Sequence, residues 1–265
     1  MKFISFGSGS SGNCYYLSTG SDAILIDVGV GIRLLKRHCI QYGVSLASVN
    51  NILLTHDHAD HIKSVGSISS HYDIPVYATE LVHEGVVHNP GVRKKIDPAL
   101  KRVVEKGKAL QIGEFNVTPF GVPHDSTDNV GYVIGACGVT FSIITDCGHL
   151  TDDMQQVIHD SDYLVIEANH DLEMLKNGPY SAYLKARISS PRGHLSNEDC
   201  GNAIAAYASS RLRHVWLCHL SEHNNNPRVA FNTVDDILQA NGINVGKDLE
   251  LTVLNRKIPT GIFEL

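Results

Sequence analysis

Residues that could do chemistry gather in one stretch, NILLTHDHADHIKS, which covers residues 51–64. It holds His56, His58, Asp60 and His61 directly after an apolar run. Histidine and aspartate are poor strand formers and mediocre helix formers, so local structure does not explain their concentration here. Imidazole nitrogens and carboxylate oxygens are good ligands for Zn²⁺ and also suit Mn²⁺ or Fe²⁺. The stretch therefore predicts a metal site rather than a solvated polar loop.

The order of these residues favours their convergence on one small volume. In an extended turn after a strand, His56 and His58 point to the same side, because side chains alternate with a period of two. Asp60 is then expected at the start of a helix, where a carboxylate interacts favourably with free N–H groups. His61 follows one position later. All four side chains can therefore meet at a strand-to-helix junction.

Two metal ions need more ligands than this stretch holds, and the sequence offers them where other predicted strands end. His124 comes just after a strand in FGVPHDS, Asp146 does so in SIITDCG, and His219 does so in VWLCHLSEH. Each of these residues alone could be an ordinary packing residue. Three candidates in the same setting predict a second group of ligands.

The succession Asp, HxHxDH, His, Asp, His resembles the signature of the metallo-β-lactamase-fold hydrolases, and each of its positions is filled between Asp27 and His219. The resemblance implies an α/β fold, the αββα sandwich, in which two mixed β-sheets are flanked by helices. It also implies two divalent metal ions, Zn²⁺ or Mn²⁺, with Fe²⁺ as a further choice. Asp27, at the end of AILID, matches the family's aspartate that orients the histidine loop.

The ligands implied by this resemblance form two groups joined by one shared residue. They are His56, His58 and His124 for one ion, Asp60, His61 and His219 for the other, and Asp146 as the bridge between both ions. Asp60 is also expected to act in catalysis, where it would orient the attacking water or accept its proton.

Within that superfamily the chain resembles the YycJ (WalJ)-like group. It shares the opening SFGSGSSGNCYYL, the run DVGVGIRLLKR that begins at Asp27, and the late GHLSNED. Members of the group are described as DNA exonucleases, so the resemblance implies a phosphodiesterase with DNA as its partner. Two alternatives stay open: an enzyme for a small phosphodiester such as a cyclic nucleotide, and a regulatory or redox module that binds metal without hydrolysis.

Two further residues suit proton transfer, namely Glu167 at the end of YLVIE and His194 in SPRGHLSNED. They resemble the late acid and histidine of the ribonuclease Z enzymes, where the pair is thought to protonate the leaving oxygen. A carboxylate partner holds an imidazole in one tautomer and raises its pKa, so the ring can be a cation near neutral pH. The alternative is a buried hydrogen-bonded pair with a structural function.

Contacts to a substrate phosphate are expected in the loop SGSSGN over residues 8–13. Its successive backbone N–H groups, with Ser10, Ser11 and Asn13, could cradle a phosphate, or the loop could be a flexible hairpin connection. Ser196 stands before a predicted helix, where it could cap the helix or contact the substrate.

A basic segment over residues 91–108 carries seven lysines and arginines, among them Lys94, Lys95 and Lys101. Charge runs are usually solvated faces. In a chain with a formal net charge of −6, this segment is nevertheless the best candidate for contact with a DNA backbone. The acidic balance itself argues against a uniformly basic nucleic-acid coat.

The elements that must position these residues alternate along the chain. Strands are expected over residues 2–7, 14–19, 23–27, 51–55, 74–78, 115–122, 130–136, 139–145, 163–167, 214–218 and 249–254. Helices are expected over residues 32–43, from the histidine cluster to about 70, over 81–87, after 151, up to 188, and over 197–209 and 228–240. No linker rich in Pro, Gly or Ser divides the halves, so we expect one domain over residues 1–265.

The composition is that of an ordinary soluble protein, with 43% hydrophobic and 19% charged residues among 265. No apolar run approaches the ~18 residues of a membrane span, so no membrane partner is expected. The apolar stretch at the start ends at Gly7 and is too short for a secretory signal, which predicts a cytoplasmic protein.

Overall fold

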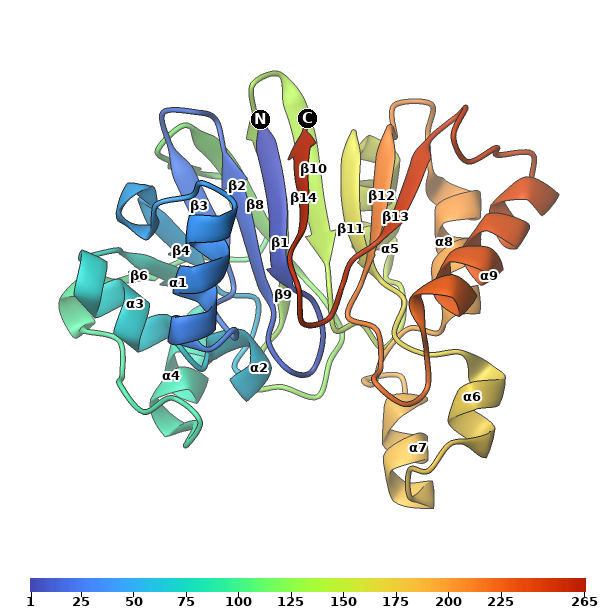
Figure 1. Ribbon diagram of the computed structural model, residues 1–265, viewed down its shortest axis with the longest axis horizontal. Coiled ribbons are helices and arrows are strands. Elements are labelled where there is room, and N and C mark those ends of the chain that lie inside the picture. The colour runs from blue at the N-terminus through green and yellow to red at the C-terminus, as the bar shows by residue number, and fades with distance from the viewer.

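The central strands of this chain are apolar on both faces, and only a sheet covered on both sides satisfies such strands. Strand β3 (Ala23–Ile26) is buried throughout. Its Ile24 and Ile26 belong to one apolar cluster, whereas Ala23 and Leu25 belong to another. In the computed structural model, which describes residues 1–265, two sheets accordingly pack face to face with helices on their outer sides (Figure 1).

The first sheet has seven strands in the order β14-β1-β2-β3-β4-β5-β6. Besides β3 they are β1 (Lys2–Gly7), β2 (Cys14–Ser18), β4 (Asn51–Leu53), β5 (Val76–Ala78), β6 (Lys101–Val103) and β14 (Thr260–Glu264). Strands β3 to β6 run parallel to one another, and the pairs β14-β1, β1-β2 and β2-β3 are antiparallel.

The second sheet has seven strands in the order β13-β12-β11-β10-β9-β8-β7. They are β7 (Leu110–Ile112), β8 (Phe115–Gly121), β9 (Val130–Ala136), β10 (Val139–Ile144), β11 (Tyr163–Glu167), β12 (His214–Cys218) and β13 (Glu250–Val253). Strands β10 to β13 are parallel, so β10, β11 and β12 end at the same edge of the sheet.

Helices cover the outer face of each sheet. Those on the first sheet are α1 (Ile32–Gln41), α2 (Ala59–Ile62), α3 (Val65–Tyr72) and α4 (Glu80–His88). Those on the second sheet are α5 (Asp152–Asp160), α8 (Asn197–Tyr207) and α9 (Pro227–Ala240). Helices α6 (Leu172–Asn177) and α7 (Ala182–Ile188) instead project beyond the lower edge of the sandwich in Figure 1.

Three apolar clusters lie between these four layers. The central one joins the inner faces of both sheets and includes the fully buried Phe3, Tyr15 and Trp216. The other two lie between each sheet and its helices. The predicted αββα sandwich with two mixed β-sheets is confirmed.

The structure corrects the predicted elements at one helix and at three strands. The helix expected to continue to about residue 70 is divided into α2 and α3, because Ser64 donates to the backbone oxygens of Val28 and Val30 at 2.9 and 2.8 Å. These bonds tie the chain to the segment after β3 and interrupt the helix. Strands β6, β7 and β14 were not expected, because all three are edge strands with largely exposed or half-buried side chains and carry little apolar pattern. Strand β14 pairs with β1.

None of the helices combines the length and the apolar character that a membrane crossing requires.

Candidate metal centre

The predicted site residues lie where strands of both sheets end. Asp27 directly follows β3, His56 follows β4, Asp146 follows β10 and His219 directly follows β12. Asp60 is in the first turn of α2, as expected. The two sheets present these ends on the same side of the sandwich, where α2 lies in Figure 1.

Three of these positions have a left-handed backbone conformation. The φ angles are 60° at Asp27, 53° at Asp146 and 54° at His219. Residues other than glycine rarely adopt such angles, and residues that do are concentrated at functional sites. Each of the three turns the chain sharply at the end of its strand.

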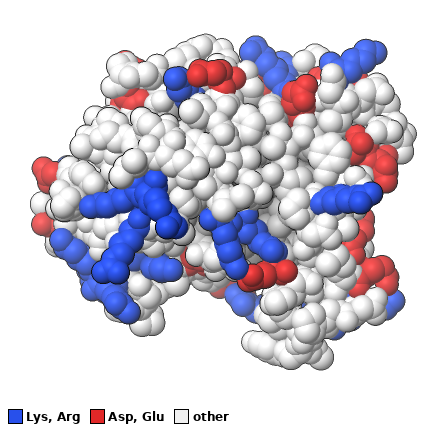
Figure 2. Space-filling view, viewed as in Figure 1, with Lys and Arg blue, Asp and Glu red and all other residues white.

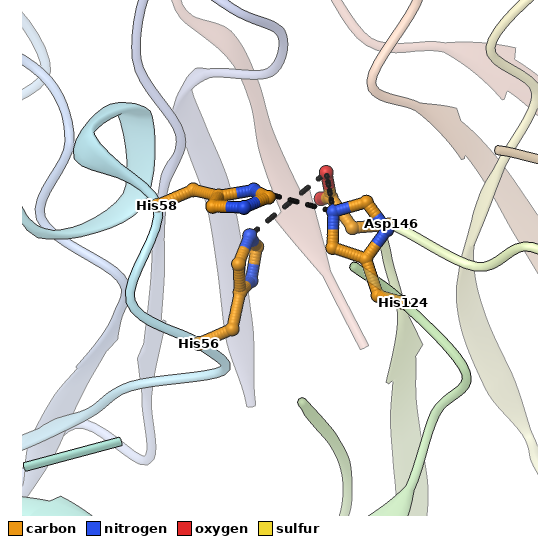
Figure 3. Close-up of side chains that lie close together, drawn as sticks. All are labelled: His56, His58, His124 and Asp146. Carbon is orange, nitrogen blue, oxygen red and sulfur yellow. Dashed lines mark hydrogen bonds and ion pairs between the residues drawn. The ribbon is translucent and has the colours of Figure 1, made fainter. Parts of the chain in front are cut away.

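One group, called here the three-histidine set, consists of His56, His58 and His124 and faces Asp146 (Figure 3). One ligand atom from each of the four residues lies within 4.8 Å of the others. The Oδ1 atom of Asp146 is 3.6 Å from Nε2 of His124 and 4.0 Å from Nε2 of His56. Nδ1 of His58 and Nε2 of His124 are 3.2 Å apart.

Uncharged partners hold the outer nitrogens of two histidines of this set. Nδ1 of His124 donates to the carbonyl oxygen of Gly193 at 3.0 Å, and Nδ1 of His56 donates to the hydroxyl of Thr55 at 3.0 Å. Each bond leaves Nε2 facing the centre. Nε2 of His56 is completely buried and has no hydrogen-bond partner. A buried nitrogen without a partner, among three imidazoles and a carboxylate, fits a divalent metal ion.

A second group, called here the carboxylate set, consists of Asp60, His61 and His219. Their ligand atoms also lie within 4.8 Å of one another. The distance from Asp60 Oδ2 to Nε2 is 3.7 Å for His61 and 3.5 Å for His219. Nδ1 of His61 donates to Oδ2 of Asp27 at 2.7 Å, so its Nε2 faces inward.

Asp146 lies between the two sets. Its Oδ1 faces the three-histidine set, whereas its Oδ2 is 3.2 Å from Nε2 of His61 in the carboxylate set. The hydroxyl of Thr145 donates to Oδ2 at 2.8 Å and holds the carboxylate in this orientation. A side chain placed in this way can contact a metal ion on each side.

Glu167 contacts more than its expected partner. Its Oε1 accepts hydrogen bonds from Nδ1 of His194 at 2.9 Å and from Nδ1 of His219 at 2.8 Å. Its Oε2 accepts from the backbone N–H groups of Cys147 and Leu195. Glu167 is completely buried, and both of its oxygens accept hydrogen bonds, so one carboxylate orients two imidazoles.

Burial and neighbouring carboxylates shift the pKa values of the histidines in opposite directions. Burial lowers the pKa of His56 well below its ordinary value and also lowers that of His124. Burial alone would lower the pKa of His61 too, but Asp146, Asp27 and Asp60 outweigh it and raise that pKa to about 10. The pKa of His219 is likewise raised by Asp146 despite burial, and that of His194 by Glu167.

The loop over residues 8–13 was expected to cradle phosphate, and only part of it is free to do so. Asn13 is completely buried, and its Nδ2 lies 2.8 Å from Nε2 of His61, so it positions the centre rather than touching a substrate. The N–H group of Gly9 donates to Asn13 Oδ1 and that of Gly12 donates to Gly9. The exposed Ser10 and Ser11 keep amides that donate no hydrogen bond within the protein.

Two other expected substrate contacts are occupied within the protein. The buried Ser196 caps α8, because its hydroxyl accepts from the N–H of Asp199 at 3.0 Å and donates to the carboxylate of Asp199 at 2.8 Å. Nζ of Lys95 donates to the backbone oxygens of Val86 and Asn89 at the end of α4. Lys94 is exposed and Lys101 is half-buried, and neither forms an ion pair.

Sequence reasoning missed the residues that hold the ligands from behind. Thr55 donates to Asp27 through its backbone N–H at 2.9 Å and through its hydroxyl at 2.8 Å. Asp125 lies 3.8 Å from Nε2 of His58 and pairs with Arg187 of α7. Thr55 and Asp125 each adjoin a predicted ligand in the sequence, and that adjacency was the only indication of their function.

Residues 22–220 match the family model described as the beta-lactamase superfamily domain. The exodeoxyribonuclease YycJ of Bacillus anthracis is 34% identical over 262 residues, which cover 99% of this chain and 98% of that protein. The exodeoxyribonuclease WalJ of Streptococcus pneumoniae is 34% identical over 250 residues, 94% of this chain and 93% of that protein.

Solved structures with the same fold include the Zn²⁺-bound PqqB of Methylobacterium extorquens, with a TM-score of 0.72, 16% identity and coverage of 99% of this chain and 100% of that one. The metallo-β-lactamase fold protein YhfI of Bacillus subtilis has a TM-score of 0.69 and 15% identity, and covers 98% of this chain and 99% of its own. The chain therefore belongs to the beta-lactamase superfamily of metal-dependent hydrolases, in the family of the YycJ and WalJ proteins.

Proposed function

We propose that this protein is a dinuclear metal phosphodiesterase that degrades DNA from an end. The observation that carries this proposal is the pair of ligand sets that meet at Asp146, with His194 beside them. The exodeoxyribonuclease names of relatives that match nearly the whole chain support the choice of DNA as substrate. The central core, which both sheets build together, supports treating residues 1–265 as one domain.

Each ligand set would hold one divalent ion, Zn²⁺ or Mn²⁺, with Fe²⁺ also suited to these ligands. Two ions held in this way would lower the pKa of the attacking water and offset the charge on a phosphate oxygen. Asp146 belongs to both sets. Asp60 lies on the more open side of the centre, with a side chain that is 23% exposed, and can orient the attacking water or accept its proton.

Two buried carboxylates position the histidines of the carboxylate set. Asp27 holds His61 through Nδ1, and Glu167 holds His219 in the same way. A hydrogen bond from the outer nitrogen fixes the tautomer and the plane of a ligating imidazole and makes its inner nitrogen a stronger ligand.

His194 is placed to protonate the oxygen that leaves phosphorus. Its Nδ1 is bound to Glu167, which leaves Nε2 as the free proton-bearing atom, and its side chain is 16% exposed. The raised pKa keeps the ring protonated at a higher pH than an isolated histidine would be. A sugar alkoxide is a poor leaving group, so a proton donor at this place typically contributes ~10²–10⁴-fold to the rate.

Contact with the DNA backbone is assigned to the basic segment over residues 91–108. Its first residue, Gly91, packs against Ala59, which stands between His58 and Asp60 in the histidine stretch. Figure 2 shows lysines and arginines gathered at the lower left of the view, where α1, α3 and α4 lie in Figure 1, and α1 itself carries Arg33, Lys36 and Arg37. Phosphate contacts of this kind provide affinity without reading sequence.

A substrate panel tests the proposal. Linear DNA labelled at its 5′ or 3′ end, RNA, a cyclic nucleotide and a β-lactam are each incubated with Zn²⁺- or Mn²⁺-loaded protein. Labelled DNA should be shortened from one end, and the other substrates should be hydrolysed far more slowly. Hydrolysis of the cyclic nucleotide alone would replace DNA by a small phosphodiester, and no hydrolysis of any phosphodiester would remove the proposal.

A further inference from the structure

Helices α6 and α7 form an arm, residues 171–188, that projects beside the metal centre (Figure 1). Both ends of the arm are tied to the body. The N–H of Asp171 donates to the backbone oxygen of Asn224 at 2.9 Å, and the N–H of His194 donates to that of Ile188 at 2.9 Å. Arg187 of α7 also pairs with Asp125, next to the ligand His124. The arm therefore has a fixed place beside the two ligand sets.

A cavity of about 150 Å³ separates the arm from the centre. Tyr180, Leu184, Ile188 and the charged Arg187 line it on the arm side, and His194 and His219 line it on the side of the centre. Ser10, whose amide donates no hydrogen bond within the protein, lies at the same cavity. The arm wall therefore offers an aromatic ring and two aliphatic side chains beside one guanidinium group, and the opposite wall carries the two histidines.

The size and lining of the cavity suit one aromatic ring. A protein cavity of about this volume binds benzene, so a six-membered ring of a nucleobase fits. The ring of Tyr180 is held edge-to-face against His223, with centroids 5.6 Å apart, and can stack on a base. Stacking on aromatic side chains is the usual way in which proteins hold unpaired bases, and it tolerates any base.

The position of His194 indicates which nucleotide of the substrate places its base in the cavity. His194 lines the cavity and, under the proposed function, donates its proton to the leaving oxygen. A ring in the cavity therefore belongs to the nucleotide whose sugar oxygen leaves. We propose that the cavity receives the base of the nucleotide on the leaving-group side of the scissile phosphodiester, at a free end of the DNA strand.

The restriction to a free end follows from the arm. The cavity has room for one ring, and the arm that stands beside it is tied to the body at both ends, which disfavours a strand that continues past it. This inference rests on the proposed function and explains why cleavage would proceed from an end rather than within a strand.

Single-stranded oligodeoxynucleotides that carry an abasic tetrahydrofuran residue at the 5′ or the 3′ terminus test the inference. The ratio of kcat/KM between the normal and the abasic substrate is measured with the metal-loaded protein at each terminus. Loss of one stacked base should lower kcat/KM by roughly 5-fold or more at one terminus and leave the other unchanged. Because the readout is a ratio within one protein, a general loss of activity cancels.

Two variants and one control assign the effect to the cavity. Tyr180→Ala removes the stacking ring and Leu184→Trp fills the space, so both should bring the ratio close to one. Tyr183→Ala is the matched control, because this tyrosine lies on the same arm but is 81% exposed and lines no part of the cavity. It should keep the wild-type ratio. Thermal unfolding of each variant shows whether it folds.

Equal kcat/KM values for normal and abasic ends at both termini of the wild type would overturn the inference, while DNA degradation itself would leave the proposed function intact. The inference would also be overturned if Tyr183→Ala brought the ratio of kcat/KM to one while Tyr180→Ala kept the wild-type ratio. If bis(p-nitrophenyl) phosphate is hydrolysed but no DNA is, the proposed function fails and the inference fails with it.

Discussion

The three-histidine set and the carboxylate set share Asp146 but differ in the partners that hold their imidazoles. Uncharged groups, the Thr55 hydroxyl and the Gly193 carbonyl, hold His56 and His124. Carboxylates hold the other two histidines, Asp27 for His61 and Glu167 for His219. The same ligand type is therefore held in two ways, by uncharged partners at His56 and His124 and by carboxylates at His61 and His219.

This difference has a consequence for metal binding. A metal ion must displace any proton on the ligating nitrogen. The lowered pKa values of His56 and His124 mean that little displacement is needed in the three-histidine set. The raised pKa values of His61 and His219 mean that protons compete with metal in the carboxylate set. We expect the three-histidine set to fill first.

The largest effect is expected from Asp146, because it is the one residue that both sets share. Asp146→Ala should lower bound metal from about two equivalents towards one or none, and should lower phosphodiester hydrolysis by roughly 10³-fold or more, since much of the charge stabilisation depends on the ions. Elemental analysis of the purified variant measures the metal. Full occupancy without Asp146 would mean that the sets are independent.

His194 belongs to neither set, so its removal should separate proton donation from metal binding. His194→Ala should keep both metals and lower DNA hydrolysis by about 10²-fold or more. Hydrolysis of bis(p-nitrophenyl) phosphate should fall far less, because nitrophenolate leaves without a proton. Equal losses for both substrates would assign His194 to phosphate positioning, and lost metal would assign it to the structure of the centre. Glu167→Gln should weaken the carboxylate set as well, because Glu167 also holds His219.

The pH dependence of metal affinity compares the sets directly. His61, with a pKa of about 10, and His219, with a raised pKa, hold their protons at neutral pH. Rising pH removes these protons, so the affinity for the second equivalent should rise by up to about 100-fold per pH unit, the limit for two displaced protons. The first equivalent should change little.

Calorimetric titration of the metal-free protein with Zn²⁺, in buffers of different ionisation enthalpy, counts the protons released at each step. If both equivalents release the same number of protons, the proposed difference between the sets does not exist.

Asp27 should affect the carboxylate set more strongly than the three-histidine set, which it reaches only through Thr55. Asp27→Asn removes the charge that holds His61, and loss of such a partner typically costs about 10–100-fold in metal affinity. The second equivalent should therefore lose more affinity than the first, as measured by titration with a chelating competitor. A loss of affinity confined to the first equivalent would mean that the carboxylate set, and not the three-histidine set, fills first.

The smallest effect is expected outside both sets, in the basic segment. Lys94→Glu with Lys101→Glu should weaken DNA binding and reduce the log–log dependence on salt by about one unit for each lost phosphate contact. Lys95 is left unchanged because it caps α4. Lys247→Glu with Arg228→Glu is a control of equal charge, because both residues are exposed and neither belongs to the basic segment. If both pairs have the same effect, net charge is responsible and the segment is only a solvated face.

Much of the centre was predictable from local sequence. His56, His58, Asp60 and His61 follow one another at a strand-to-helix junction, and the spacing of two and the start of a helix are enough to bring them together. Apolar runs such as YLVIE and HVWLC predicted β11 and β12 with the bounds that the structure has. Short-range sequence patterns determine the strands and the histidine stretch, because consecutive residues of one strand or turn follow the same backbone conformation.

Other features depend on contacts between distant segments. Glu167 pairs with His219 because β11 and β12 are parallel and end side by side, with Glu167 opposite Cys218. Asn13 was predicted to touch phosphate but is buried against His61, because the loop after β1 packs on α2 through the bond from Asn13 to Asp60. The cavity beside α7 also forms only where the arm meets the ends of two strands. The sequence by itself determined which residues are candidates for the centre. The tertiary structure decided which nitrogen each histidine presents, because that depends on partners up to 69 positions away in the chain, as with His124 and Gly193.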